Sequence, residues 1–417
     1  MISGHMGLSL RGVVLLMLPS TTSSAYLGLR NQGNTCYMNS LLQSLHHLPE
    51  FRQAIYTIPT KLRPNASSAA DNQIPLELQR VFYHLECAEL AGASEVGTEQ
   101  LTRSFGWTRA DVMVQQDVQE FARMLCDALQ QSMRAHGVRD AVAELFEGRT
   151  SSLTRCTRVD FASEKEERFY DLQLQVQGCR NLQASLRHFV HEERLTGSNQ
   201  YNTRDPQLGK QDACRATRFK SLPPVLQLHL KRFEYDAETG GMHKLQQAFA
   251  FPTRLMLHKF MAASAAADAP PPDYELAAVL SHAGGAGSGH YIAYVRPRGS
   301  KQWWEFDDTR VTPVAEHVAV KQQFGGRHSR GGGVFGGAPN AYMLVYVRRD
   351  AAETAAEGGE GEAAAALPSE VRDAFERELG LRKGQRGAPG RAAVGRGASA
   401  AAEEAAPVVE EEYDYAS

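Results

Sequence analysis

One cysteine near the start of the chain stands where a thiol could be activated as a nucleophile. Asn31 to Thr35 is a polar segment in which Gly33 permits a tight turn, and Cys36 follows it at the expected start of a helix. The positive end of a helix dipole and its free N–H groups stabilise negative charge on a sulfur in that place. The same N–H groups, with the side-chain amide of Asn31, could hold an oxyanion. Taken alone, a free cysteine is more often a small buried packing residue.

A histidine and two aspartates far along the chain supply the groups that such a thiol needs: His290, Asp307 and Asp308. A nucleophilic thiol requires a histidine within hydrogen-bond reach, and that histidine requires a third group on its other nitrogen. If His290 opens one strand and Asp307 closes the next, the hairpin sets the two side chains side by side. Separately, each residue would be interpreted as structural. Together with an early cysteine they predict a catalytic triad.

The composition of the chain argues against several kinds of partner. Its 417 residues are 42% hydrophobic and 22% charged, enough apolar material for one large or two ordinary globular domains. The formal net charge of −3 shows no basic excess, so neither nucleic acid nor a membrane is an expected partner. The six cysteines are widely spaced and form no C-x-x-C pair. This spacing predicts reduced thiols, a location in the cytosol or nucleus, and no metal or cofactor.

Three segments are expected along the chain. Residues 1–25 form a leader that loosely resembles a signal peptide, but its apolar core is short and we expect disorder. Residues 26–350 form the catalytic domain. Residues 351–417 form a low-complexity tail, rich in Ala, Gly and Glu, that cannot offset its ordering entropy by burial. Within the tail, residues 368–382 predict a short amphipathic helix, because Val371, Phe375 and Leu379 stand at helical spacing.

The expected secondary structure changes character along the domain. Helical apolar spacing covers residues 38–48 and 114–133, whereas the later part favours strands by composition and alternation. Helices first and strands afterwards predict an α+β fold rather than alternating βαβ units. Two stretches rich in Gly or Ala, 262–272 and 325–339, predict long surface loops. Strands are expected at residues 168–176, 225–233, 275–279, 290–295, 303–306 and 341–347.

Four motifs follow one another between residue 26 and about residue 349. They are GLRNQGNTCYMNS at 28–40, QDVQEF at 116–121, LPPVL through HLKRF at 222–233, and GHY at 289–291 with FDD at 306–308 and AYMLVY at 341–346. In this order they resemble the catalytic domain of the ubiquitin-specific protease family. The phrases SFGW at 104–107 and VQQDVQE at 114–120 are most similar to its herpesvirus-associated members. The resemblance implies a papain-like α+β fold with a helical thumb, a β palm and β fingers.

The resemblance also implies a function, that of a cysteine-type deubiquitinase. It would hydrolyse the (iso)peptide bond after the C-terminal glycine of ubiquitin through a thioester on Cys36. His290 would act as base and then as acid, Asp307 would orient it, and Asn31 would help to hold the oxyanion. Asp308 would hydrogen-bond near the oxyanion or steer a water. The implied partners are ubiquitin and ubiquitinated proteins, and we expect a monomer. Two alternatives stay open, a catalytically silent ubiquitin-binding module and a protease for another ubiquitin-like protein.

Five further residues are candidates for contact with the substrate. Asp117 and Glu120 stand three residues apart, a spacing that puts both carboxylates on one face of a helix. There they could receive the guanidinium groups of the arginine-rich ubiquitin tail. The alternative is a pair of solvated surface acids. The resemblance implies substrate contacts for Tyr291, Phe233 and Trp107 as well.

Two departures from the family pattern affect these expectations. The family often binds zinc through two C-x-x-C pairs in the fingers, whereas here the corresponding places carry isolated Cys156 and Cys214, so no metal is expected. The loop before His290 has Ser288, where the herpesvirus-associated members of the family have a further glycine. Because that loop is expected to touch the substrate tail, Ser288 bears on affinity more than on activity.

Overall fold

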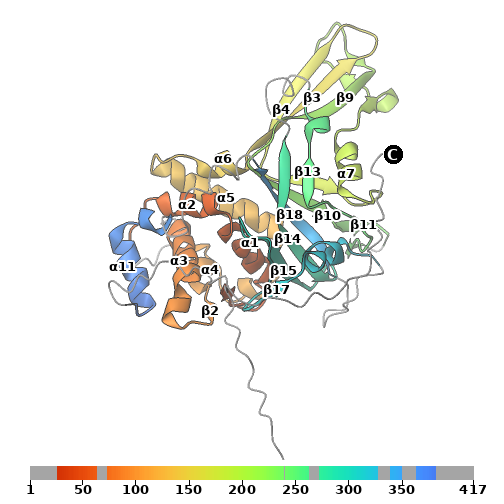
Figure 1. Cartoon of the computed structure of the whole chain (residues 1–417). Coiled ribbons are helices and arrows are strands. Elements are labelled where there is room, and N and C mark those ends of the chain that lie inside the picture. Colours follow the sequence, from red (N-terminus) through yellow and green to blue (C-terminus); the bar gives the residue numbers. More distant parts are fainter. Residues whose placement is uncertain are drawn as a thin grey trace, which may run out of the picture.

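The computed structural model describes residues 26–62, 73–238, 240–262, 272–326, 339–349 and 363–381. The expected leader at 1–25, most of the two expected long loops, and the tail apart from residues 363–381 lie outside the described residues. A group of helices packs against one face of a large sheet, and a second sheet projects from it (Figure 1). Among the described residues no helix is long and apolar enough to cross a membrane.

Helix α1 (Cys36–His46) lies between the other helices and the large sheet. All 11 of its residues are buried, as expected of a helix enclosed on every side. It packs against α2 (Pro49–Thr57), α5 (Val118–Ala135) and strand β15 (Gly289–Val295). The helix therefore carries its first residue, Cys36, to the sheet. The other elements of this part are α3 (Ile74–Cys87), the 3₁₀ helix η1 (Ala88–Ala91), α4 (Glu99–Ser104), the 3₁₀ helix η2 (Asp111–Met113) and α6 (Ala141–Phe146).

The large sheet has eight strands in the order β17-β16-β15-β14-β18-β10-β5, with β13 paired to β14. Its pairs are antiparallel except β10 with β5. Both faces are buried: Val345 belongs to the core under the helices, and Leu344 and Tyr346 to a second core on the opposite face. The remaining strands of the sheet are β5 (Leu172–Gln175), β10 (Val225–Lys231), β13 (Arg254–Met256), β14 (Asp273–Gly284), β16 (Trp303–Asp307), β17 (Arg310–Val314) and β18 (Asn340–Arg348).

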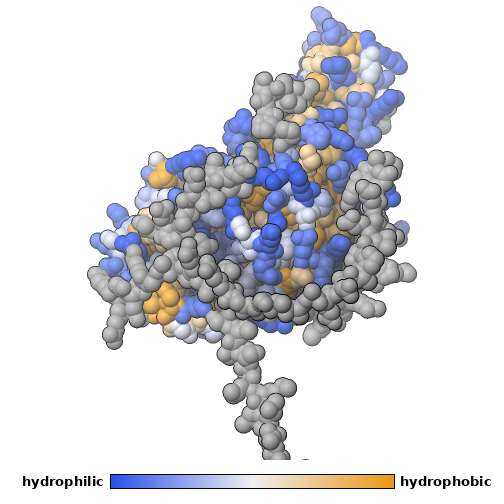
Figure 2. Space-filling view, viewed as in Figure 1, coloured by the Kyte–Doolittle hydropathy of each residue, from blue (hydrophilic) through white to orange (hydrophobic). Residues whose placement is uncertain are grey.

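A four-stranded sheet, in the order β4-β3-β9-β6, projects from the end of the molecule opposite α11 (Figure 1). Figure 2 shows apolar residues gathered on this projection and at its base, among hydrophilic ones. Its strands are β3 (Gly148–Cys156), β4 (Ala162–Phe169), β6 (Glu193–Leu195) and β9 (Ala213–Ser221). Three two-stranded pairs complete the described strands: β1 (Gly28–Leu29) with β2 (Glu95–Val96), β7 (Tyr201–Asn202) with β8 (Lys210–Gln211), and β11 (Phe233–Asp236) with β12 (Gly241–Lys244). The short helices are α7 (Leu182–Phe189), η3 (Gly197–Asn199), η4 (His258–Phe260), α9 (Glu316–Ala319), η5 (Lys321–Phe324) and η6 (Ala363–Ala366).

Three expected elements have different bounds in the structure. The helix expected over 114–133 begins only at Val118, because Asp117 is extended and caps it. The strand expected over 225–233 ends at Lys231, and Arg232 separates it from β11. The Arg232 side chain is fully buried and donates to four main-chain carbonyl groups, which compensates for burying a charge. The strand expected over 168–176 is divided between β4 and β5.

The helix expected in the tail is present as α11 (Ser369–Glu378), docked on α3. Phe375 is fully buried there, with the Arg80 guanidinium 4.9 Å from its ring centre and the Tyr83 ring 5.7 Å away. Tyr83 also donates a hydrogen bond of 3.2 Å to Glu376. The prediction of an amphipathic helix is confirmed, and its apolar face is the one that packs.

Replacing Phe375 with alanine is expected to release this helix. Truncating a buried phenylalanine costs about 3 to 5 kcal/mol of stability. A short helix without its packing contacts is only marginally stable in water, so it cannot offset this loss. Amide hydrogen exchange should therefore rise across α11 by at least about tenfold, while α1 stays protected. Arg377→Ala on the exposed side of α11 is the matched control and should leave exchange unchanged. Unaltered protection in Phe375→Ala would show that the packing does not hold the helix.

Candidate active site

The loop before α1 sets the position of Cys36. The side-chain oxygen of Asn31 accepts hydrogen bonds from the main-chain N–H groups of Gly33 (2.9 Å) and Thr35 (3.1 Å), which folds the loop back on itself. Gly33 has a φ of 143°, a conformation that favours glycine, as expected for the tight turn. Cys36 is the first residue of α1 and is 2% exposed. The predicted helix start at Cys36 is confirmed.

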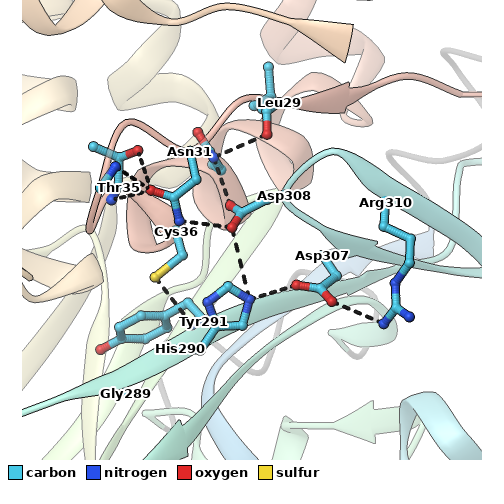
Figure 3. Close-up of polar contacts among 12 residues, drawn as sticks. Leu29, Asn31, Thr35, Cys36, Gly289, His290, Tyr291, Asp307, Asp308 and Arg310 are labelled. Atoms are coloured by element: carbon cyan, nitrogen blue, oxygen red, sulfur yellow. Dashed lines mark hydrogen bonds and ion pairs between the residues drawn. The ribbon is translucent and has the colours of Figure 1, made fainter. Parts of the chain in front are cut away.

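The expected hairpin brings His290 and Asp307 together. His290 lies at the start of β15 and Asp307 at the end of β16, and these strands are antiparallel neighbours. His290 Nε2 lies 2.6 Å from Asp307 Oδ1, and the main-chain N–H of Tyr291 donates to Cys36 Sγ over 3.4 Å (Figure 3). Arg310 donates to the other Asp307 oxygen at 3.0 Å. Residues from both ends of the domain therefore meet at one point.

The ionisation of His290 follows from its neighbours. Burial alone would lower its pKa, but the hydrogen bond to Asp307 and the adjacent Cys36 side chain outweigh burial and raise the pKa from 6.5 to about 10. The hydrogen bond from His290 lowers the pKa of Asp307 in turn, against the effect of burial. At neutral pH the ring is thus an imidazolium held by a carboxylate.

Asp308 holds two amide side chains rather than the histidine. It occupies the turn between β16 and β17 with a φ of 52°. One carboxylate oxygen accepts from Asn31 Nδ2 at 2.8 Å (Figure 3). The other accepts from Asn39 Nδ2 at 2.8 Å. His290 Nε2 is farther away, 4.0 Å from Asp308. This arrangement makes Asp307 the partner of the histidine and Asp308 the residue that orients Asn31.

Of the two acids expected on one helix, only Glu120 belongs to the helix itself, and contact of either acid with the substrate tail stays a prediction. Asp117 is the N-cap of α5, where one of its oxygens accepts from the Gln119 N–H at 2.7 Å and the other from the Tyr342 hydroxyl. The periodic pattern had placed the helix start four residues too early. Glu120 lies in the first turn of α5 and is exposed.

The three aromatic candidates have different surroundings. Tyr291 is 2% exposed, and its main-chain N–H donates to Cys36 Sγ. Contact of its ring with the substrate stays a prediction. Phe233 is half-buried against the rings of His282 and Tyr342. Trp107 is half-buried and stacks on Phe105, with ring centres 5.2 Å apart. Substrate contact by Phe233 and Trp107 stays a prediction.

Three residues at the site had been given no role from the sequence. Asn39 and Arg310 contact the two aspartates, and Gln115 Nε2 lies 2.8 Å from the Gly289 carbonyl oxygen and 3.6 Å from Cys36 Sγ. A sequence signal for Asn39 did exist, because it is a polar residue one helical turn after Cys36 on a helix whose positions are all buried. Gln115 and Arg310 carried no such signal, because only the fold brings them to the triad.

Cys156 and Cys214 lie near the end of the projecting sheet. Cys156 is 6% exposed in a small cluster with Leu195 and Ala213, and Cys214 lies on the facing strand β9. Among the described residues, His290, Asp307 and Asp308 form a group of potential metal ligands, and neither of these cysteines belongs to it. Within that group His290 Nε2 lies 2.6 Å from Asp307 Oδ1.

The purified protein is therefore expected to need no zinc. Two isolated thiols cannot supply the four ligands of a structural zinc site, and a protein folded around zinc unfolds when the metal is removed. Metal analysis should find well under one zinc per chain, and a chelator should leave the melting temperature unchanged. Stoichiometric zinc, together with unfolding by the chelator, would contradict this expectation.

A helix-borne cysteine, a strand-borne histidine and an aspartate on the next strand form an arrangement suited to nucleophilic chemistry by a thiol, within an α+β fold. Comparison with known proteins agrees: residues 27–346 match the family model of the ubiquitin carboxyl-terminal hydrolases. The chain belongs to this family. The helices form its thumb, the eight-stranded sheet its palm and the four-stranded sheet its fingers.

Several characterised proteins are similar to this chain. Ubiquitin C-terminal hydrolase 13 of Arabidopsis thaliana is 42% identical over 79% of the chain and 30% of its own length. Ubiquitin carboxyl-terminal hydrolase 7 of Drosophila melanogaster is 39% identical over 79% of the chain and 28% of its own length. A solved structure of the SAGA DUB module with Ubp8, bound to monoubiquitin, matches with a TM-score of 0.63 and 25% identity over 78% of this chain and 70% of that one. The chain thus spans under a third of the length of the Arabidopsis and Drosophila relatives.

Proposed function

We propose that the chain is a cysteine-type deubiquitinase, which hydrolyses the (iso)peptide bond after the C-terminal glycine of ubiquitin. The observation that carries the proposal is the alignment of Cys36, His290 and Asp307, with 2.6 Å between His290 Nε2 and Asp307 Oδ1. Family membership supports the substrate class, because the similar proteins are named as ubiquitin hydrolases and one similar structure is bound to monoubiquitin.

The reaction begins with the proton already on His290, as the raised pKa of its imidazole requires. The Cys36 thiolate attacks the glycine carbonyl, and the oxyanion is held by N–H donors of the site. As the intermediate collapses to a thioester, His290 donates its proton to the departing amine. His290 is then the base that activates water to cleave the thioester. Throughout, Asp307 fixes the ring and stabilises its positive charge.

Two rival functions are separated by a comparison of substrates. Fluorogenic amides of ubiquitin and of other ubiquitin-like proteins should be offered to the same enzyme preparation. We expect turnover of the ubiquitin amide with a kcat/KM at least about 100-fold above that of the others. Binding of ubiquitin without turnover would favour the catalytically silent module. Preferred turnover of another ubiquitin-like amide would favour the second rival.

Of the two acids, Glu120 is the one that binds the arginines of the ubiquitin tail in this proposal, because the carboxylate of Asp117 is engaged as a helix cap. Glu120→Ala is expected to lower kcat/KM by about threefold on the native tail, the size of an exposed ion pair, and to change nothing on a tail whose arginines are alanine. Asp117→Ala should lower both rates alike, since losing a cap disturbs the site whatever the tail. Equal losses for Glu120→Ala on both tails would show that it does not read arginine.

The setting of the enzyme is also part of the proposal. No disulfide joins any of the six cysteines, all of which lie within the described residues, and this supports a reducing compartment such as the cytosol or nucleus. A monomer that acts on ubiquitin and ubiquitinated proteins, without nucleic acid or membrane, fits the near-neutral net charge of −3. Fractionation of cells that produce the tagged chain, followed by light scattering of the purified protein, tests location and mass together.

A further inference from the structure

Gln115 joins the segment that carries the nucleophile to the strand that carries the base. It lies between η2 and α5 and is half-buried. Its side-chain nitrogen donates to the carbonyl oxygen of Gly289 over 2.8 Å, directly before His290 in the chain. The same nitrogen lies 3.6 Å from Cys36 Sγ. One amide group therefore contacts both halves of the triad.

The segment around Gln115 is held in place by the loop before Cys36. The main-chain N–H of Asn34 donates to the Val112 carbonyl oxygen over 2.9 Å, and the Asn34 side chain donates to the Met113 carbonyl oxygen. Met113 and Val114 are 57% and 60% exposed, so this edge of the site is open to solvent. The segment that carries Gln115 is thus tied by hydrogen bonds to the loop that precedes Cys36.

The hydrogens of this amide have two different acceptors. A side-chain amide carries two N–H groups, and here one is used by the Gly289 carbonyl. The geometry leaves the other directed to the sulfur. Asn31, the donor expected from the sequence, has its amide nitrogen bound to Asp308 at 2.8 Å. Of these two side-chain amides, the one with a direct contact to the thiol is that of Gln115.

We propose that Gln115 is a further catalytic residue, whose side-chain N–H donates to the oxyanion formed on ubiquitin's C-terminal glycine; this rests on the proposed function. In that step an electron pair of Sγ forms the S–C bond, and the π pair of the carbonyl moves onto oxygen. The oxygen shares its carbon with Sγ, and the proposal places it against the Gln115 N–H that faces the sulfur. On collapse the C=O bond returns, the C–N bond breaks, and the amine takes the proton of His290.

A merely structural role predicts a different pattern of losses. If Gln115 only ties Gly289 to the loop, its removal misplaces His290 or Cys36 and slows every reaction of the thiol. Two ubiquitin derivatives separate the cases. Hydrolysis of a C-terminal amide passes through an oxyanion, whereas displacement of halide from a C-terminal alkyl halide forms the S–C bond without one.

The test compares Gln115→Ala and Gln115→Met, the second of which keeps the volume but removes the donor. Both should lower kcat/KM for the ubiquitin amide by about 100-fold, as loss of one oxyanion donor does, and change alkylation of Cys36 by the ubiquitin alkyl halide less than about twofold. The adjacent Gln116→Ala is the matched control and should keep both rates.

Each other outcome decides against the inference. Parallel losses on both derivatives in the folded Gln115→Met enzyme would make Gln115 a positioning residue, and unchanged amide hydrolysis would remove it from the mechanism. The parent enzyme is measured first. A parent that hydrolyses no ubiquitin amide overturns the proposed function together with this inference, whereas an active parent with parallel losses overturns the inference alone.

Discussion

Replacing Cys36 with alanine is expected to abolish hydrolysis of a fluorogenic ubiquitin amide while leaving ubiquitin binding within about threefold of the parent. The nucleophile and its base act together, so removing the nucleophile lowers turnover by at least about 10,000-fold. Binding survives because Cys36 is 2% exposed and contributes almost no surface for a partner to bury. Initial rates and calorimetric titration with ubiquitin, on the same preparation, measure the two effects.

The matched control for this change is Cys126→Ala. Cys126 is also buried on a thumb helix, but desolvation by burial raises the pKa of its thiol to about 12, which keeps it protonated and inert. We expect this variant to keep full turnover. Turnover by Cys36→Ala within tenfold of the parent, or loss of turnover in Cys126→Ala without unfolding, would contradict the assignment of Cys36.

The two neighbouring aspartates are expected to differ in their effects. Asp307→Ala should lower kcat by about 1,000-fold to 10,000-fold, because it removes the group that orients His290 and stabilises its charge. Asp308→Ala should lower kcat by about 100-fold, the effect of misplacing an oxyanion donor, since its carboxylate holds Asn31 and Asn39. A larger loss in Asp308→Ala than in Asp307→Ala would reverse the two roles.

The pH dependence of Asp307→Asn checks the same assignment. The hydrogen bond to Asp307, together with the adjacent Cys36 side chain, raises the pKa of His290 from 6.5 to about 10, so in the parent the proton needed by the leaving amine is lost only as the pH rises toward that value. Without the carboxylate the pKa of His290 falls, and the alkaline limb of kcat/KM should move to lower pH. An alkaline limb at the same pH in both enzymes would show that Asp307 does not set the charge on the ring.

Much of the site could be predicted because its chemistry depends on local features. A glycine turn followed by a helix marks Cys36, and two short alternating segments mark the hairpin that carries His290 and Asp307. Each of these signals lies within about 20 residues of chain, where periodicity and turn residues are informative. The amphipathic helix of the tail was predictable for the same reason.

The structure differs from the sequence-based expectations where tertiary contacts override a local pattern. Asp117 fits a helical period, but its carboxylate caps α5 and accepts from Tyr342, which lies far along the chain on β18. The hydroxyl group of Tyr291 would allow the side chain to lie at the surface, but its ring packs between the rings of His282 and Tyr342. Gln115 reaches the triad only because the thumb docks on the palm. Such contacts depend on the packing of segments that are distant in sequence, which spacing does not encode.

The measurement that tests the central claim most directly is labelling of the intact chain with ubiquitin that carries a C-terminal electrophile, followed by peptide mapping of the modified residue. The account predicts one ubiquitin per chain, attached to Cys36 through sulfur, with labelling prevented by Cys36→Ala and slowed in His290→Ala. Modification at another cysteine, or no modification of a folded protein that still binds ubiquitin, would contradict it.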